Sequence, residues 1–215
     1  MSDPGQELAI RAWAELLGPV RDILEKITGP CATEIGLTFG EAARAYPLKR
    51  ALKLFEKVKR MAASAGVELR PVARRLLFPI LESALIEDDE GLHNRWAALL
   101  TNASAATFEN DVLPSFPDIL RQLIPVDAQF LDKAYDETVE EGQGHKRPIG
   151  ESTLSSATPV MIGNLERLGL LSRDMVDMGD FTSGMTHHTF SPANHLFVSP
   201  FGRAFIPACR APQRR

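Results

Sequence analysis

The feature that most constrains the fold is residues 82–103, ESALIEDDEGLHNRWAALLTNA, where an acidic run separates two helical patterns of apolar residues. The first pattern closes with Leu81, Ala84 and Leu85. The second recurs at the spacing that places one apolar stripe along a helix. Its members are Leu92, Trp96, Leu99, Leu100 and Ala103. We therefore expect two helices that meet at a joint, with the Trp96 side chain buried.

The acidic run consists of Glu87, Asp88, Asp89 and Glu90. Asp88 or Asp89 suits the N-cap of the second helix, because a short side-chain oxygen accepts hydrogen bonds from the open backbone N–H groups. The other acids fall in or near the first turn, where the helix dipole favours negative charge. A divalent metal site that includes His93 is the alternative, but adjacent acids on a turn point in different directions. We predict a structural joint beside the tryptophan, with no metal and no cofactor.

Charge is unevenly distributed along the 215 residues, whose net charge is −4. Residues 44–75 carry ten basic and two acidic side chains, whereas residues 109–141 carry nine acidic and two basic ones. The negative total argues against a protein dedicated to nucleic-acid binding, and the basic segment is typical of a surface that meets an acidic partner or an anionic membrane.

The basic segment begins with a predicted amphipathic helix, PLKRALKLFEKVKRMAASAG, which we expect to end at Gly66. Its apolar face is expected to carry Leu48, Leu52, Phe55, Val58 and Ala62. The cations of this helix and of the following segment are the candidate partner-binding residues, namely Lys49, Lys53, Lys57, Arg60, Arg74 and Arg75. The pattern fits equally well an ordinary surface helix, whose long cationic stems cover its own apolar edge.

The pattern of elements predicts a mainly α-helical protein with two domains. An N-terminal multi-helix domain is expected at residues 6–112, including a helix over 30–46. The stretch ATFENDVLPSFP, with prolines at 114 and 117, is the predicted boundary and a candidate hinge. Residues 125–209 read as helix, loop, helix, NLERLGLL, a small β-hairpin and a helix capped by Ser199, which is the layout of a winged helix-turn-helix.

The predicted winged helix has few cationic side chains for a domain that binds duplex DNA. Its recognition helix offers Asn164, Glu166 and Arg167, and the preceding helix is acidic. Duplex binding depends on several cations that face phosphates. We therefore favour a winged helix that binds protein, with a DNA-binding transcriptional regulator as the alternative.

No motif of a known catalytic site is present in the chain. His187 and His188 are adjacent and would point to opposite faces of a strand, so they are poorly placed to chelate one ion. Cys31 and Cys209 lie far apart, outside any metal-binding or disulfide framework. The N-terminal residues lack the pattern of a signal peptide, and no apolar run reaches the length of a membrane span. We expect a cytoplasmic, non-enzymatic protein.

Several stretches of the chain resemble the abortive infection alpha family of bacterial proteins. They are LLGP at 16–19, GPCATEIG at 29–36, KRALKLFEKVKR at 49–60, PILESALIEDDEGLHNRWAALLTNA at 79–103, NLERLGLL and SPFGRAFIPAC. The resemblance implies a role in defence against phage, in which infected cells stop growing or die before the phage matures. It supplies no catalytic residues. The expected partner is a protein, with an anionic membrane surface or a second copy of the chain as alternatives and DNA less favoured.

Overall fold

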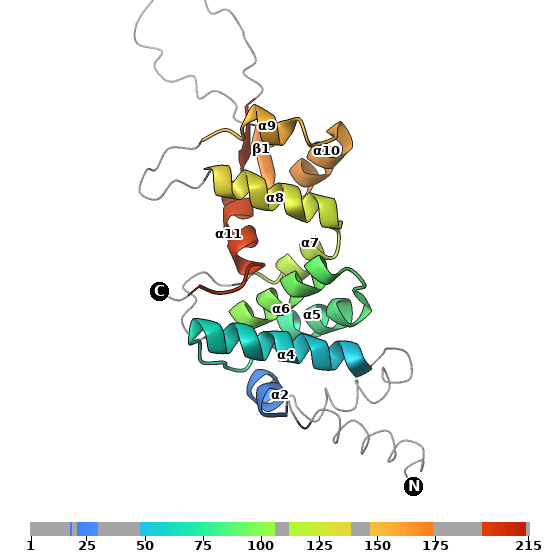
Figure 1. Ribbon diagram of the computed structural model, residues 1–215, viewed down its shortest axis with the longest axis vertical. Helices are drawn as coiled ribbons and strands as arrows, with labels where there is room; N and C mark the ends of the chain where they lie inside the picture. The colour runs from blue at the N-terminus through green and yellow to red at the C-terminus, as the bar shows by residue number, and fades with distance from the viewer. Residues whose placement is uncertain are drawn as a thin grey trace, which may run out of the picture. The chain divides into compact units, whose positions relative to one another are not determined.

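A computed structural model describes residues 18, 21–29, 48–105, 112–138, 147–173 and 195–213 (Figure 1). Internal contacts divide the chain into two compact units, one formed by Met1–Pro125 with Pro207–Arg215 and the other by Val126–Ile206. The described part is mainly helical with one small antiparallel pair of strands, as predicted. The predicted helix over 30–46 and the pair His187 and His188 lie outside the described residues.

The first unit is built around α6, which spans Glu90–Ser104. Helices α4 (Leu48–Ala65) and α5 (Arg74–Ile86) pack against it and against each other, α7 (Phe116–Leu120) packs on α5, and α2 (Arg21–Thr28) packs on α4. Trp96 is 1% exposed, which confirms its predicted burial. The sequence predicted one apolar face on this helix, yet Ala97 and Ala98 are buried too, because two helices rather than one cover α6.

Helix α4 is amphipathic, as its spacing predicts. Its buried apolar face carries Ala51, Leu54, Phe55, Val58 and Ala62, each at most 5% exposed. Leu52 was expected on this face and is only half-buried. The helix ends before Gly66, whose φ of 69° is the left-handed conformation of a C-terminal stop. The loop that follows is anchored by a backbone hydrogen bond of 2.9 Å from Val72 N to Ile27 O.

The stretch that was predicted as a boundary belongs to the first unit. Phe116 and Leu120 of α7 are each 1% exposed, and the helix packs on α5. The division between the units falls between Pro125 and Val126, at the start of α8 (Pro125–Thr138). The prolines at 114 and 117 therefore precede or begin a packed helix rather than form an open hinge.

The second unit continues with α9 (Glu151–Leu154), α10 (Pro159–Arg167), β1 (Leu171–Arg173), β2 (Leu196–Val198) and α11 (Pro200–Ala208). The two strands are antiparallel, with Leu171 opposite Val198. Ile149 N donates a hydrogen bond of 2.8 Å to Leu196 O, which ties the segment before α9 to β2. Gly169, with a φ of 73°, follows the end of α10 in the left-handed conformation of a C-terminal stop.

Helix α11 begins with the predicted cap. The Ser199 hydroxyl oxygen accepts a hydrogen bond of 2.8 Å from Gly202 N, and its proton is donated to Gly169 O. A Cβ at Gly202 would lie 2.3 Å from Leu170 O, closer than any real contact. This close approach of the helix to the residue that precedes β1 requires glycine.

Candidate functional site

The acidic joint between α5 and α6 has the predicted structural role. Asp89 is the N-cap of α6, and its Oδ1 accepts a hydrogen bond of 2.8 Å from Leu92 N. The Glu87 carboxylate accepts one of 2.9 Å from Asp89 N, which orders the turn before the cap. The capping prediction is therefore confirmed, with Asp89 rather than Asp88 in that position.

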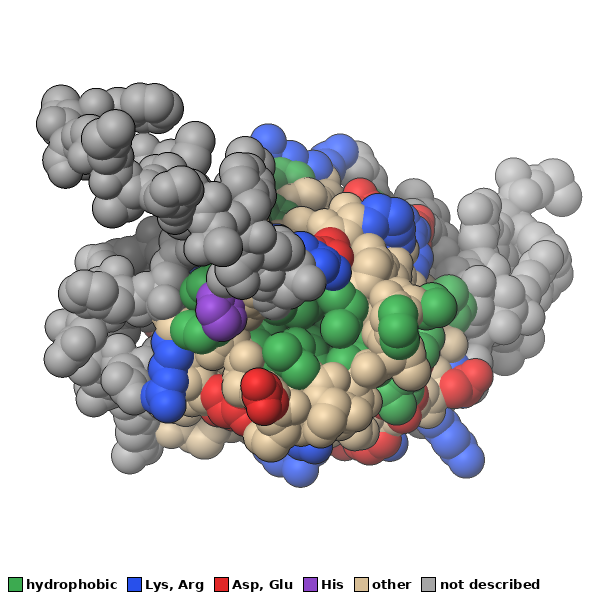
Figure 2. Space-filling view, turned by 90° about the horizontal axis from the view of Figure 1, so that it is seen from above, with side chains coloured by type: hydrophobic (Ala, Val, Ile, Leu, Met, Phe, Trp, Pro, Cys, Tyr) green, Lys and Arg blue, Asp and Glu red, His purple; other side chains and the backbone are tan. Residues whose placement is uncertain are grey.

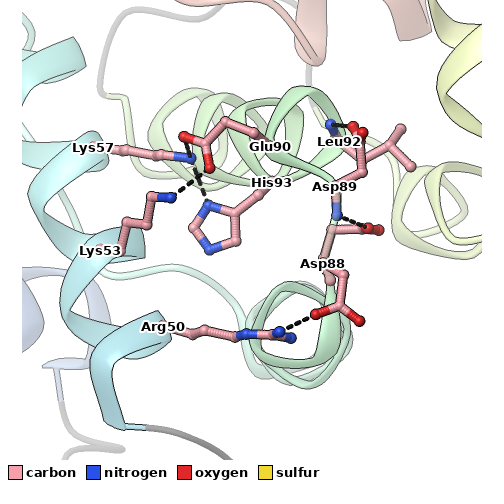
Figure 3. A network of polar contacts seen from close by, with 9 residues as sticks. Arg50, Lys53, Lys57, Asp88, Asp89, Glu90, Leu92 and His93 are labelled. Atoms are coloured by element: carbon pink, nitrogen blue, oxygen red, sulfur yellow. Dashed lines mark hydrogen bonds and ion pairs between the residues drawn. The ribbon is translucent and has the colours of Figure 1, made fainter.

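The two remaining acidic residues of the joint form ion pairs with basic residues of α4. Asp88 forms an ion pair with Arg50, and Glu90 forms ion pairs with Lys53 and Lys57, the second at 2.9 Å between Glu90 Oε1 and Lys57 Nζ (Figure 3). Hydrogen bonds from the two lysines lower the pKa of Glu90 to about 2. We call this group, with His93, the clasp: it joins one face of α4 to the start of α6.

Lys57 lies at the inner edge of the clasp and differs from its predicted position. It was expected on the partner-binding face, but it is only 2% exposed. Its ammonium group is satisfied from α6, by Glu90 and by His93 Nδ1 at 2.7 Å. A lysine in this position is held by its own fold and is not accessible to a partner.

His93 is a neutral hydrogen-bond acceptor in this arrangement. An ammonium group has only protons to offer, so Nδ1 must accept from Lys57 and the ring proton must lie on Nε2. Burial, followed by the charge of Lys57, lowers the pKa of His93 from 6.5 to about 4. Nε2 is buried and has no hydrogen-bond partner within the described residues. The histidine is thus held uncharged at neutral pH.

The chemistry of the clasp is that of a structural ion-pair network. Its acids point toward ammonium and guanidinium groups (Figure 3), which leaves the metal alternative for the acidic run without support. Over the residues that the structure describes, no three side chains of the metal-binding types come together. In the same part of the chain, no helix combines the length and hydrophobicity needed to cross a bilayer.

The other candidate partner-binding residues lie on the surface. Lys49 and Lys53 are exposed near the start of α4, although Lys53 also contributes to the clasp. Arg60 is exposed toward the other end of the same helix, and Arg74 and Arg75 are exposed in the first turn of α5. The structure therefore separates the predicted set into cations that bind α6 and cations that face solvent.

Sequence reasoning missed two members of the clasp. Arg50 was counted among the bases of the segment but was not proposed as a site residue, and His93 was considered only as a metal ligand. The spacing of Arg50, Lys53 and Lys57 places them on one side of a helix, which is the signal that was available. The identity of the opposing residues was not available, since they lie more than thirty positions away along the chain.

The candidate recognition helix of the second unit presents few available charges. Arg167 donates to Asn164 Oδ1 at 2.7 Å, and the Glu166 carboxylate accepts from Arg173 Nε at 2.7 Å. Val160, in the first turn of α10, is 82% exposed. Figure 2 shows apolar side chains gathered in the middle of the face that it views, with acidic and basic side chains around them.

Comparison with known proteins gives one match. A family model described as abortive infection alpha matches residues 49–209, which include parts of both units. Neither the curated proteins nor the solved structures contain a significant match to the chain.

Proposed function

The chain belongs to the abortive infection alpha family, and we propose that it serves antiphage defence as a non-enzymatic component that acts by binding a partner protein. The family supports a role in abortive infection. The contact mechanism rests on the solvent-facing cations of the first unit. They remain exposed, although the acidic joint of the same unit forms ion pairs with neighbouring cations.

The exposed cations fit an acidic partner for electrostatic reasons. Charges of one sign gathered on a surface raise the rate of association with a partner of opposite charge and add specificity. Lys49, Arg60 and Arg75 have no ion-pair partner within the described residues. Lys57 is removed from the proposed surface because it is buried. An anionic membrane surface is the alternative target, and a cytoplasmic location is part of the proposal.

For the second unit we propose a winged helix that binds protein. The order α8, α9, α10, β1 and β2, with a hydrogen bond from Ile149 N to β2, supports this topology. Val160 on α10 is exposed, whereas Arg167 and Arg173 already donate hydrogen bonds within the chain. These observations favour an apolar contact over a phosphate backbone. A salt titration of binding to duplex DNA tests the alternative regulator, because measurable binding at low salt that weakens as salt rises would favour it.

The experiment for the contact mechanism is a charge reversal on α4. Bacteria that produce the wild-type chain are expected to restrict a susceptible phage, and the Lys49→Glu, Arg60→Glu variant is expected to lose that protection. Both side chains are exposed, so the fold is expected to survive, which a circular dichroism melt and tryptophan fluorescence would verify. Full protection by a folded variant would refute the role of these cations.

A further inference from the structure

The last turn of α6 holds three separate segments of the first unit together. Thr101 Oγ1 lies 3.9 Å from Met61 Sδ near the end of α4. Ser104 O accepts a hydrogen bond of 2.7 Å from Arg70 N, in the loop before α5. Asn102 Nδ2 donates to Ala208 O at 2.8 Å, in the segment that ends α11. We call Thr101, Asn102 and Ser104 the polar turn; each is at most 1% exposed.

Each segment that the polar turn holds carries an arginine at or beside the point of contact. Arg60 precedes Met61, Arg70 donates its own backbone N–H, and Arg210 O accepts from Asn102 Nδ2 at 2.9 Å. Arg74 and Arg75 follow Arg70 in the first turn of α5. All are exposed except Arg210, which is half-exposed. We call these five residues the arginine cluster, because the contacts of the polar turn bring together the segments that carry them, from positions up to 150 residues apart.

Within the part of the chain that the structure describes, three arginines of the cluster lack an ion-pair partner, and one of them, Arg75, lies in the first turn of α5. Helix α5 begins with two arginines, no acid in its first turn and no side-chain cap, although the positive end of a helix dipole disfavours cations there. The other two arginines without an ion-pair partner in this part of the chain are Arg60 and Arg70. The clasp shows the opposite situation, since every one of its cations meets a carboxylate.

We propose that the arginine cluster is the docking surface for an acidic segment of the partner protein. The proposal rests on the contact function above and names its surface and the chemistry of its partner. Guanidinium groups match carboxylates in a bidentate geometry that lysine does not offer. The acidic joint is an example within this chain of the kind of segment that fits, because its carboxylates already bind cations of α4.

The exposed residues between the arginines argue against other anionic ligands. At positions 63, 64, 66, 68, 71 and 73 they are Ala, Ser, Gly, Glu, Pro and Ala. Single-stranded nucleic acid is held by aromatic side chains that stack on bases, and a membrane surface by large apolar side chains that insert into it. None of these residues offers either.

The first test is a binding measurement with the full chain at low salt, using a labelled twelve-residue glutamate peptide, a duplex DNA and vesicles rich in phosphatidylserine as probes. Arg70→Glu, Arg75→Glu is the test variant. Arg121→Glu, Lys133→Glu is the matched control, because it makes the same change in net charge at exposed positions outside the cluster. We expect the wild type to bind the peptide, the test variant to bind at least tenfold more weakly, and the control to stay within threefold.

Three outcomes would overturn the proposal: no peptide binding by the wild type, equal loss in both variants, or a cluster-dependent binding of DNA or vesicles that exceeds that of the peptide. A phage-protection assay separates this proposal from the function on which it rests. If the wild type protects and the test variant protects equally, the docking surface is wrong while the defence function stands. If the wild type does not restrict any phage, the proposed function itself fails.

Discussion

The depressed pKa of His93 makes a quantitative prediction about the stability of the first unit. A group whose pKa is lower in the folded protein than in the unfolded chain destabilises the fold as the pH drops below the unfolded value, because the unfolded chain then binds the proton more readily. With 6.5 for the unfolded chain and about 4 for the folded protein, the loss begins near pH 6.5 and is complete near pH 4. Between pH 7.5 and 5.0 it amounts to about 2 kcal/mol.

Glu90 does not obscure this effect, because its carboxylate titrates at lower pH. Its pKa falls from 4.5 to about 2 in the folded protein, so the stability that it contributes is present above pH 4.5 and is lost as the pH falls toward 2. From pH 7.5 to 5.0 its carboxylate is largely ionised in both states. The change in stability over this pH interval therefore reports mainly on His93.

The assay is urea unfolding at pH 7.5 and 5.0, followed by tryptophan fluorescence. The chain has two tryptophans, so Trp13→Phe leaves Trp96, which is buried in the same helix as His93, as the single probe of the first unit. His93→Gln in this background removes the titrating group. We expect the parent protein to lose about 2 kcal/mol more than the variant over this pH interval.

The control is His195→Gln, which removes an exposed histidine from the second unit. It is expected to follow the parent protein at both pH values. An equal loss in the parent and in His93→Gln would refute the reasoning, since it would show that His93 titrates alike in the folded and the unfolded chain.

Three further predictions concern single positions. Lys57→Met is expected to raise the pKa of His93 without restoring it fully, because it removes the charge of Lys57 but not burial; a titration of the histidine ring by NMR measures this, and an unchanged pKa would contradict it. Asp89→Ala is expected to cost about 1 kcal/mol of stability through loss of the α6 cap, whereas Asp89→Asn costs less, as measured by urea unfolding. Gly202→Ala is expected to destabilise the second unit by roughly 1–3 kcal/mol, because its methyl group overlaps Leu170 O; a melting temperature equal to that of the wild type would show that the backbone yields.

Local signals in the sequence predicted the elements and their ends well. Three helix ends depend only on chemistry within a few residues: the cap at Asp89, the stop at Gly66 and the start of α11 after Ser199. They can therefore be predicted without knowledge of the fold. The burial of Trp96 follows from periodicity in the same way.

Contacts between distant segments could not be predicted in this way. Lys57 reads as a surface cation because helical periodicity describes one helix at a time, and its burial depends on a carboxylate and an imidazole supplied by α6. The hydrogen bonds from Asn102 to the segment at 207–210 join residues more than one hundred positions apart. A polar residue near the end of a helix gives no indication of such a partner.

The clasp also bears on how the arginine cluster is presented. Removing the partner of a buried charge is costly, because the charge is then left uncompensated in the interior. Glu90 is exposed, so Lys57 is the buried member of their ion pair. With its ammonium group bonded to both Glu90 and His93, rotation of α4 would leave a buried charge unpaired. The clasp therefore fixes the register of α4 at one end, and the contact of Met61 with Thr101 shows that the same register holds Arg60 beside the polar turn at the other.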